Sequence, residues 1–313
     1  MKISILGCGW LGFPLAQKLI ETGYEVKGST TSENKIDILQ SNKIEPFLIE
    51  LTEDKITGAI SEFLNDSEIL IIDIPPGLRK ITENTTEKTF VNKIKILIPF
   101  IESSTIEKVI FISSTSVYSE SDLIPTVTEE SILYPDTESG KQLAEVENLL
   151  RNTSNFQTTI IRFGGLIGED RNAVKMLTGK TNVANPEAPI NLIHQEDCIG
   201  ILCEILKQVQ HDKIWNETFN AVAPIHPTRK NYYTEKAKQL DLIAPLFNEN
   251  ETSIGKIVSS EKLKKVLGYK FRNLILDQYH FLIRQNSIIT FRSKIVCWIF
   301  FGKDHNEIAA PST

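Results

Sequence analysis

Apolar and polar residues follow two periods along the first half of the chain. Short apolar runs bounded by turn residues predict buried strands, and runs with apolar residues three or four apart predict helices. The predicted strands are residues 2–6, 24–28, 45–49, 68–74, 108–113 and 158–162. The predicted helices are residues 11–21, 33–40, 56–64, 85–102 and 138–151. Strands and helices therefore alternate along this half of the chain.

The pattern becomes less regular after Gly164 and Gly165. Here it predicts strands at 191–194 and 217–221 and helices at 197–209, 229–240, 260–267 and 273–285. Continuous apolar strands between helices are typical of a parallel sheet that is covered on both faces. The sequence thus predicts an α/β fold, a Rossmann-type doubly wound parallel sheet with a smaller C-terminal substrate-binding lobe.

The predicted domain boundaries follow this change in pattern. We expect residues 1–165 to form the Rossmann domain, with residues 190–222 returning to it. Residues 166–189 and 223–285 form the expected substrate lobe. The last stretch, 286–313, has no clear period, and the sequence predicts no role for it.

Composition and charge narrow the classes of partner. The formal net charge is −6 and the charges are mixed along the chain, so no basic stripe favours nucleic acid. The four cysteines lack metal-ligand spacing, which favours reduced thiols, no metal and a cytoplasmic location. No apolar run is long enough to span a bilayer, and Met1 and Lys2 lead directly into a strand rather than a leader peptide. We expect a small-molecule substrate, no nucleic acid and no membrane span, and leave an oligomer open.

A glycine-rich loop follows the first predicted strand and opens the first predicted helix. Residues 7–12 read Gly-Cys-Gly-Trp-Leu-Gly, a G-x-G-x-x-G pattern in the context that supports dinucleotide binding. In such a loop Gly7 permits the tight turn, Gly9 lets the backbone approach a pyrophosphate, and Gly12 allows close helix packing. We expect Trp10 and Leu11 to contribute to the same NAD or NADP site, where helix N-terminal amides face phosphate. The alternative is a glycine-rich turn without a ligand.

The end of the second predicted strand bears on the choice between NAD and NADP. Units that prefer NAD usually place a carboxylate there for the ribose 2′-hydroxyl. This chain instead offers Ser29, Thr30 and Thr31, with no carboxylate before Glu33 and with Lys35 nearby. Hydroxyls and a cation suit a 2′-phosphate, so NADP is favoured. The alternative is that the same residues form only a turn and a helix cap.

Three further features lie at the predicted carboxyl edge of the sheet. Pro75 and Pro76 follow the fourth strand, and we expect them to form a rigid wall beside the cofactor. Asp136 is predicted to cap helix 138–151, and Asp197 to cap the helix that follows strand 191–194.

The end of the fifth predicted strand carries a motif that indicates a family. Residues 113–118 read Ser-Ser-Thr-Ser-Val-Tyr, and Arg-Phe-Gly-Gly-Leu-Ile-Gly (162–168) and Ile-His-Gln-Glu-Asp (193–197) follow in order. Together these segments resemble the extended short-chain dehydrogenases/reductases, the NAD-dependent epimerase/dehydratase family, over roughly residues 1–285. The resemblance implies that Ser114 hydrogen-bonds the reacting oxygen of the substrate. It also implies that Lys141 holds the hydroxyls of the nicotinamide ribose.

The chain departs from this family at its catalytic Tyr-x-x-x-Lys pair. Lys141 is in place, but Thr137 stands where the family has tyrosine. In the family that tyrosine is the general acid/base, and proton transfer of this kind contributes about 10²–10⁴-fold. We name Tyr134, in the loop before the helix, as the candidate general acid/base in place of that tyrosine. Tyr118 and Glu138 are further alternatives. The pattern resembles an atypical subgroup of the superfamily.

The function expected from this resemblance is NAD(P)-dependent. The chain is expected to be an oxidoreductase of the epimerase/dehydratase type that acts on a small hydroxyl- or carbonyl-bearing substrate, with sugar nucleotides among the candidates. Arg162, Arg171 and Arg229 are candidates to meet a phosphate or carboxylate. The alternative hypothesis is a non-catalytic dinucleotide-binding sensor or scaffold, because Thr137 replaces the tyrosine. A lyase or isomerase that uses bound cofactor transiently is a third hypothesis.

Overall fold

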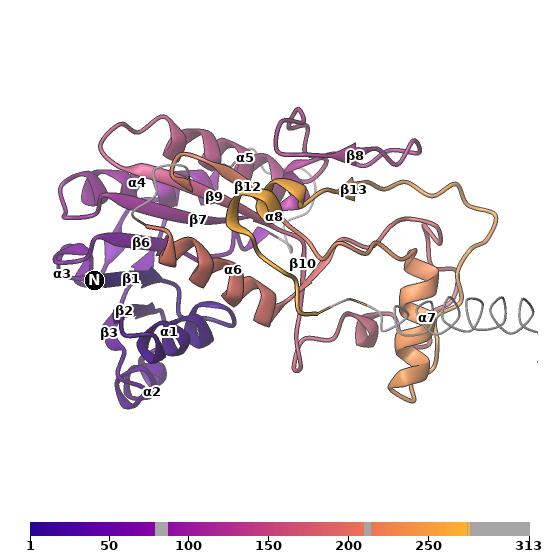
Figure 1. Cartoon of the computed structure of the whole chain (residues 1–313), viewed down its shortest axis with the longest axis horizontal. Helices are drawn as coiled ribbons and strands as arrows, with labels where there is room; N and C mark the ends of the chain where they lie inside the picture. The colour runs from indigo at the N-terminus through magenta and orange to yellow at the C-terminus, as the bar shows by residue number, and fades with distance from the viewer. Residues whose placement is uncertain (79–86, 210–213, 274, 276–313) are drawn as a thin grey trace, which may run out of the picture. The chain divides into compact units, whose positions relative to one another are not determined.

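The central element of the computed structural model is a seven-stranded parallel sheet (Figure 1). The structure describes residues 1–78, 87–209, 214–273 and 275, so the predicted helix 273–285 and the stretch 286–313 lie outside the described residues, apart from 273 and 275. The strand order is β12-β9-β7-β6-β1-β2-β3. The bounds are β1 Lys2–Leu6, β2 Glu25–Thr30, β3 Glu45–Leu48, β6 Ile69–Ile72, β7 Lys108–Ser114, β9 Gln157–Phe163 and β12 Thr218–Ala221.

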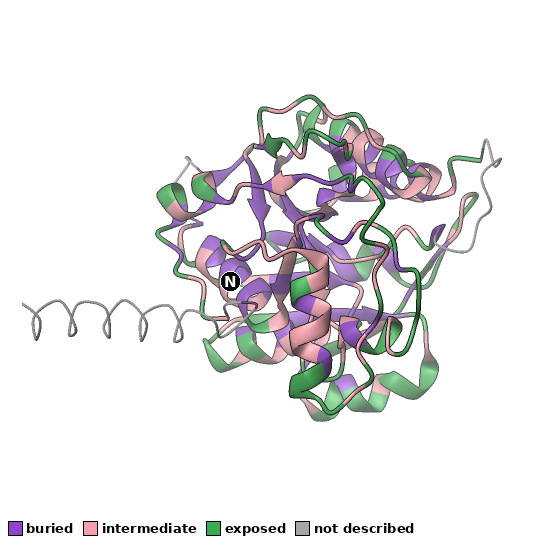
Figure 2. Ribbon diagram, turned by 90° about the vertical axis from the view of Figure 1, so that its right-hand side faces the viewer, coloured by how far each residue is buried: buried purple, intermediate pink, exposed green. Residues whose placement is uncertain are grey.

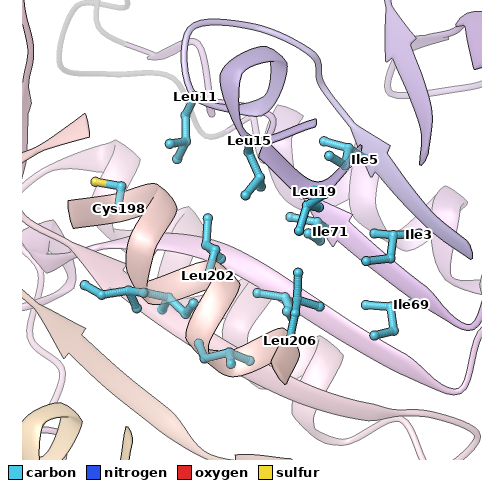
Figure 3. Packing of buried hydrophobic residues seen from close by; sticks show 14 of the residues in the cluster. Ile3, Ile5, Leu11, Leu15, Leu19, Ile69, Ile71, Cys198, Leu202 and Leu206 are labelled. Atoms are coloured by element: carbon cyan, nitrogen blue, oxygen red, sulfur yellow. The ribbon is translucent and has the colours of Figure 1, made fainter. Parts of the chain in front are cut away.

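Helices cover both faces of this sheet, as the alternation predicted. Successive strand residues point to opposite faces, so Ile69 and Ile71 of β6 pack on one side and Leu70 and Ile72 on the other. Helices α1, α2 and α6 contribute to the first apolar cluster (Figure 3), and α3, α4 and α5 to the second. The bounds are α1 Gly12–Glu21, α2 Ile36–Ser41, α3 Ile60–Leu64, α4 Thr89–Glu102, α5 Glu138–Arg151 and α6 Gln195–Lys207. Figure 2 shows the strands as a buried layer beneath partly exposed helices.

The chain reverses direction across the sheet between β1 and β6. From β1 it proceeds to β2 and β3 on one side, and then crosses to β6, β7, β9 and β12 on the other. Ligands of open α/β sheets bind outside the carboxyl ends of the strands at such a switch point. The predicted doubly wound Rossmann-type sheet is therefore confirmed, and its topology selects the edge where a site is expected.

Shorter elements lie outside the central sheet. They are β4 Glu50–Leu51 with β5 Ile56–Thr57, β8 Thr126–Val127 with β13 Ile257–Val258, β10 Gly165–Ile167 with β11 Leu192–His194, and the helices α7 Arg229–Gln239 and α8 Glu261–Leu267. Residues 1–275 form one compact unit. The predicted division into a Rossmann domain and a substrate lobe stays a prediction. In the described part of the chain, no helix is both long and apolar enough to cross a membrane.

One predicted helix begins later than its pattern suggests. The spacing predicted a helix over 56–64, but Ile56 and Thr57 form β5 and the helix begins at Ile60. Gly58 has a φ of +102°, which side-chain-bearing residues rarely adopt and which breaks a helix. Pairing with β4 thus overrides the apolar spacing at the start of this segment.

Candidate functional site

The glycine loop lies between β1 and α1, at the switch point of the sheet. Gly7 has a φ of +108°, and a Cβ there would overlap the Asp73 carbonyl oxygen. A Cβ at Gly12 would overlap the Gly7 carbonyl oxygen, whereas one at Gly9 would meet nothing within 4 Å. The fold itself therefore requires Gly7 and Gly12, while Gly9 faces open space that a Cβ would fill. Two amides of this turn are already engaged, because the Gly9 N–H donates to the Gly7 carbonyl oxygen and the Phe13 N–H donates to the Gly9 carbonyl oxygen. The open space at Gly9, next to the start of α1, is the place that fits a pyrophosphate.

Ser29 holds the glycine loop in place. Its Oγ accepts a hydrogen bond from the Gly7 N–H at 2.9 Å, and its carbonyl oxygen accepts one from the Cys8 N–H at 2.8 Å. The Ser29 side chain is buried, with a residue exposure of 2%. The hydroxyl predicted to meet a 2′-phosphate is thus already engaged by the loop.

The other predicted 2′-phosphate residues differ in accessibility. Thr30 is buried, and its Oγ1 accepts from the Ser32 N–H at 3.1 Å. Thr31 and Lys35 are exposed. The side chains of Thr31 and Lys35 are therefore the better placed of the four to meet a phosphate from solvent, and this contact stays a prediction.

Trp10 directs its side chain away from the loop and onto residues 168–171. Its Nε1 donates to Asp170 Oδ1 at 2.8 Å, and the Arg171 guanidinium lies 5.0 Å from its ring centre. Its carbonyl oxygen accepts from Gln195 Nε2 at 2.6 Å. Leu11 is buried in the core. At Trp10 and Leu11, therefore, the backbone rather than the side chain is the part that a cofactor can contact.

Asp73 is a residue of this site that the sequence did not single out. It follows β6, and its N–H donates to the Leu6 carbonyl oxygen at 2.9 Å. A Cβ on Gly12 would lie 3.1 Å from Asp73 Oδ2, so the carboxylate sits directly against the start of α1. Burial raises the pKa of Asp73 to about 7, although a hydrogen bond from the Gly12 amide favours the carboxylate. The available signal was an acid immediately after an apolar strand, at the edge where ligands bind.

Pro75 and Pro76 follow Asp73 at the same edge. Pro75 is exposed and Pro76 is half-buried. The structure thus places both at the carboxyl end of β6, next to the glycine loop that follows β1. Their predicted role as a wall beside the cofactor stays a prediction.

Ser114 ends β7 and is followed by a 3₁₀ turn that packs against α5. Its Oγ accepts from the Ser116 N–H at 3.2 Å. A Cβ on Gly140 would overlap the Ser116 carbonyl oxygen, so the first turn of α5 lies directly on this loop. Lys141 is exposed in that turn, and its Nζ lies 4.0 Å from Glu138 Oε2. The structure thus brings the Ser114 loop and the turn of α5 that carries Lys141 together.

Thr137 is the N-cap of α5. Its Oγ1 accepts from the Gly140 N–H at 3.1 Å. The predicted cap, Asp136, was wrong by one residue, because the Asp136 carboxylate accepts instead from the Glu120 N–H at 2.8 Å. The hydroxyl that replaces the family tyrosine therefore terminates a helix.

The predicted cap of α6 was also wrong. His194 occupies the cap position, and its Nδ1 accepts from the Glu196 N–H at 3.3 Å. Asp197 is fully buried and accepts instead from the Tyr269 hydroxyl at 2.8 Å and from the backbone of residues 272 and 273. Asp197 thus fixes the end of the described chain onto α6.

The two tyrosines considered as replacement acids lie in different surroundings. Tyr134 is 74% exposed in the loop before α5. Tyr118 is buried, donates to Asn220 Oδ1 at 2.8 Å and accepts from Arg162 Nη1 at 2.6 Å. Burial raises the pKa of Tyr118 even though Arg162 lowers it. Tyr118 is therefore part of the packed interior, and only Tyr134 is accessible from solvent.

The three candidate arginines also differ. Arg162 is buried and forms a two-point ion pair with Glu147, with Nη2 2.6 Å from Oε2 and Nε 3.0 Å from Oε1. Arg171 stacks on Trp10, and the Arg229 guanidinium lies 5.8 Å from the Tyr233 ring centre. Arg162 is thus fully engaged inside the protein. Across the ranges that the structure describes, no cluster of three or more metal-ligating side chains occurs.

A doubly wound sheet with a glycine loop after its first strand defines a Rossmann dinucleotide-binding protein. The model of the NAD(P)H-binding family matches residues 7–192, and the chain belongs to this family. The chain is 30% identical to Protein YeeZ of Escherichia coli K12 over 273 residues, which are 87% of this chain and 96% of that protein.

Solved structures show the same fold at low sequence identity. A short-chain dehydrogenase/reductase superfamily protein from Agrobacterium tumefaciens with bound NAD has a TM-score of 0.67 at 15% identity, over 93% of this chain and 100% of that one. UDP-glucuronic acid 4-epimerase from Bacillus cereus, in complex with NAD, has a TM-score of 0.71 at 17% identity, over 88% and 93%. The fold is therefore that of the short-chain dehydrogenase/reductase and epimerase/dehydratase superfamily.

Proposed function

We propose that this chain binds NADP(H) and transfers hydride between the nicotinamide and a small hydroxyl- or carbonyl-bearing substrate oriented by Ser114. One observation carries the proposal: the glycine loop after β1 and Ser114 at the end of β7 lie at the same sheet edge, with β6 between the two strands. Two structures with this fold, the Bacillus cereus epimerase and MoeE5, contain NAD, and MoeE5 also contains UDP-glucuronic acid. A sugar nucleotide is accordingly the substrate class that we would test first.

In this proposal the chain's own residues bind and orient the reactants. The loop amides and the start of α1 hold the pyrophosphate, Thr31 and Lys35 meet the 2′-phosphate, and Lys141 meets the nicotinamide ribose. The bound nicotinamide supplies a hydride acceptor or donor. Because Ser114 Oγ already accepts from Ser116, its own hydrogen can donate to the substrate oxygen.

The proton must come from a group other than residue 137. A threonine hydroxyl is too weak an acid for this role, and the Thr137 hydroxyl already accepts from the Gly140 amide. Tyr134, exposed three positions earlier, is the candidate donor.

The same capping hydrogen bond favours a second candidate function, a dinucleotide-binding module that performs no chemistry. Such a module would bind NADP(H) and change its affinity for a protein partner with the redox state of the nicotinamide. Partner capture that differs between NADPH and NADP⁺, without turnover, would support it.

Calorimetric titration with NADPH, NADP⁺, NADH and NAD⁺ tests the shared part of both proposals. A panel of carbonyl substrates, including sugar nucleotides, then tests turnover by the loss of NADPH absorbance. We expect Ser114→Ala to lower turnover by about tenfold or more, and Ser61→Ala, an exposed serine of α3, to leave it unchanged. Cofactor binding without any turnover would contradict the proposed enzymatic function. If none of the four cofactors bound, both proposals would be contradicted.

A further inference from the structure

The start of α1 already holds a negative charge that belongs to the protein. A Cβ on Gly12 would lie 3.1 Å from Asp73 Oδ2, so the half-buried Asp73 carboxylate lies against the start of the helix. Gly12 is the last glycine of the loop and the first residue of a ten-residue helix, so its amide points along the positive end of the helix dipole. This is the same helix end that the proposed dinucleotide site offers to a pyrophosphate.

A second anion at this helix end would repel the first. A pyrophosphate held by the glycine loop would bring two further negative charges to the same helix end. Like charges within a few ångströms in a partly desolvated site disfavour the ionised form of the weaker acid. A pyrophosphate linking two nucleosides stays ionised near neutral pH, so the carboxyl group is the one that can become neutral.

We propose that Asp73 takes up one proton when the dinucleotide binds, and that this proton makes dinucleotide affinity fall as the pH rises above neutrality. The inference rests on the proposed dinucleotide binding. The proton comes from the solvent and bonds to a carboxylate oxygen of Asp73, and no bond in the nucleotide changes. The protonated carboxyl group no longer opposes the pyrophosphate.

The groups that act on Asp73 electrostatically are two thiols whose pKa values lie above neutrality. The Cys8 thiol reaches it from the loop and the Cys198 thiol from α6. Burial raises the pKa of Cys8 to about 12 and raises that of Cys198, so both thiols stay neutral. The Lys35 ammonium also acts on Cys8. Of the carboxyl group and the two thiols, Asp73 is the one with a pKa near neutrality, about 7.

The linkage predicts the sign and the size of the effect. Below its pKa Asp73 is already protonated, and binding takes up no proton. Above it, binding must protonate the carboxylate, so the dissociation constant rises by up to about tenfold per pH unit. We expect the affinity for NADPH to fall by about tenfold between about pH 6 and pH 8.5.

The experiment is calorimetric titration of the full chain with NADPH in two buffers of different ionisation enthalpy, across this pH range. The difference in observed heat between the buffers counts the protons taken up. The 2′-phosphate itself titrates with a pKa of about 6, so the count is made above about pH 7.5, where that group is already ionised. This readout uses the unmodified protein and does not depend on turnover.

Two variants assign the proton. Asp73→Asn keeps an oxygen that can accept from Gly12 and removes the titration, so we expect tight binding at all pH values and no proton uptake. Asp66→Asn is the matched control, because Asp66 is exposed on the segment that enters the other end of β6 and has a φ of 59°, which asparagine tolerates. It should behave as the unmodified protein does.

The outcomes separate the two proposals. Binding with no proton uptake and no pH dependence would overturn the inference and leave dinucleotide binding intact. Equal proton uptake by Asp73→Asn would also overturn it. Failure of NADPH and NADH to bind even near pH 6 would instead overturn the proposed function, and the inference with it.

Discussion

Two carboxylates near the carboxyl edge of the sheet, the fully buried Glu147 and the half-buried Asp73, differ in what surrounds them. Glu147, on α5, accepts hydrogen bonds from Ser113 and from two nitrogens of Arg162. Asp73, beside α1, has the Gly12 amide and no cation among the groups that shift its pKa. Burial alone would lower the pKa of Arg162, but the Glu147 carboxylate raises it, so the guanidinium stays charged. The Asp73 carboxyl group instead has a pKa of about 7.

The difference shows that a counterion determines whether an acid shielded from solvent keeps its charge. Glu147 is part of a closed polar network that ties α5 to β7 and β9. No cation is among the groups that shift the pKa of Asp73, so a proton or a ligand can change its protonation state. Closed networks are expected to stabilise the fold, and open ones to respond to conditions.

The largest expected effect is the loss of the closed network. Glu147→Gln leaves the Arg162 guanidinium buried without a counter-charge, which should lower the free energy of unfolding by about 3–5 kcal/mol. Denaturant unfolding measures this. The control is Glu145→Gln, whose partly exposed carboxylate pairs with Lys88 and should cost less than about 1 kcal/mol. If Glu147→Gln and Glu145→Gln lowered the free energy of unfolding equally, the buried network would have no special role in stability.

Gly12→Ala should have the next largest effect, because residue 12 lies against both the Gly7 carbonyl oxygen and the Asp73 carboxylate. The new Cβ would overlap the Gly7 carbonyl oxygen, so the loop must move, at about 3 kcal/mol of stability. Gly9→Ala is the matched variant, since its Cβ meets nothing within 4 Å. It should leave stability within about 0.5 kcal/mol and still lower NADPH affinity. A stable Gly9→Ala protein with unchanged affinity would contradict the placement of the pyrophosphate.

Asp73→Asn should increase stability, in contrast to Glu147→Gln. Folding raises the pKa of Asp73 from 3.8 to about 7, so the ionised group opposes folding, and stability falls as the pH rises through this range. Three pKa units correspond to about 4 kcal/mol, and we expect about 2 kcal/mol because the residue is partly exposed. Thermal unfolding should show the gain at about pH 8 and almost none at about pH 4. A gain that does not depend on pH would argue against an ionised Asp73.

The smallest expected effect belongs to Thr137, a neutral acceptor at another helix N-terminus. Thr137→Ala removes the cap of α5 and should cost about 1 kcal/mol, and Thr137→Ser should restore it. Unlike the Asp73 effect, this loss should be the same at all pH values between about 5 and 8, since no charge is involved. Unfolding curves at two pH values provide the measurement.

Features set by neighbouring residues were predictable from the sequence. The glycine loop and the strand that precedes it are adjacent in the chain, and the alternation of apolar strands and helices sufficed for the doubly wound sheet. The family resemblance singled out Ser114 and Lys141, and their roles stay predictions. Gly140, which allows the Ser114 loop to lie against α5, has no local signal because its partner is the Ser116 carbonyl oxygen.

Features set by distant residues were missed. Asp136 and Thr137 both suit a cap, and the choice depends on the Glu120 amide that occupies Asp136. Asp197 was taken for a cap because its buried partner, the Tyr269 hydroxyl, comes much later in the chain. Asp73 likewise acts on the pKa of Cys198, a residue of α6 that comes much later in the chain. No periodicity near residue 73 contains this information.

The packing of Trp10 against Gly168 restricts how this sequence can change over evolution. Even the smallest addition at residue 168, a Cβ, would lie 2.8 Å from Trp10 Cζ2. The indole is also held by its hydrogen bond to Asp170, so it has no unhindered way to turn aside. A descendant that replaces the glycine must therefore also replace the tryptophan, and the two positions are expected to be inherited as a pair.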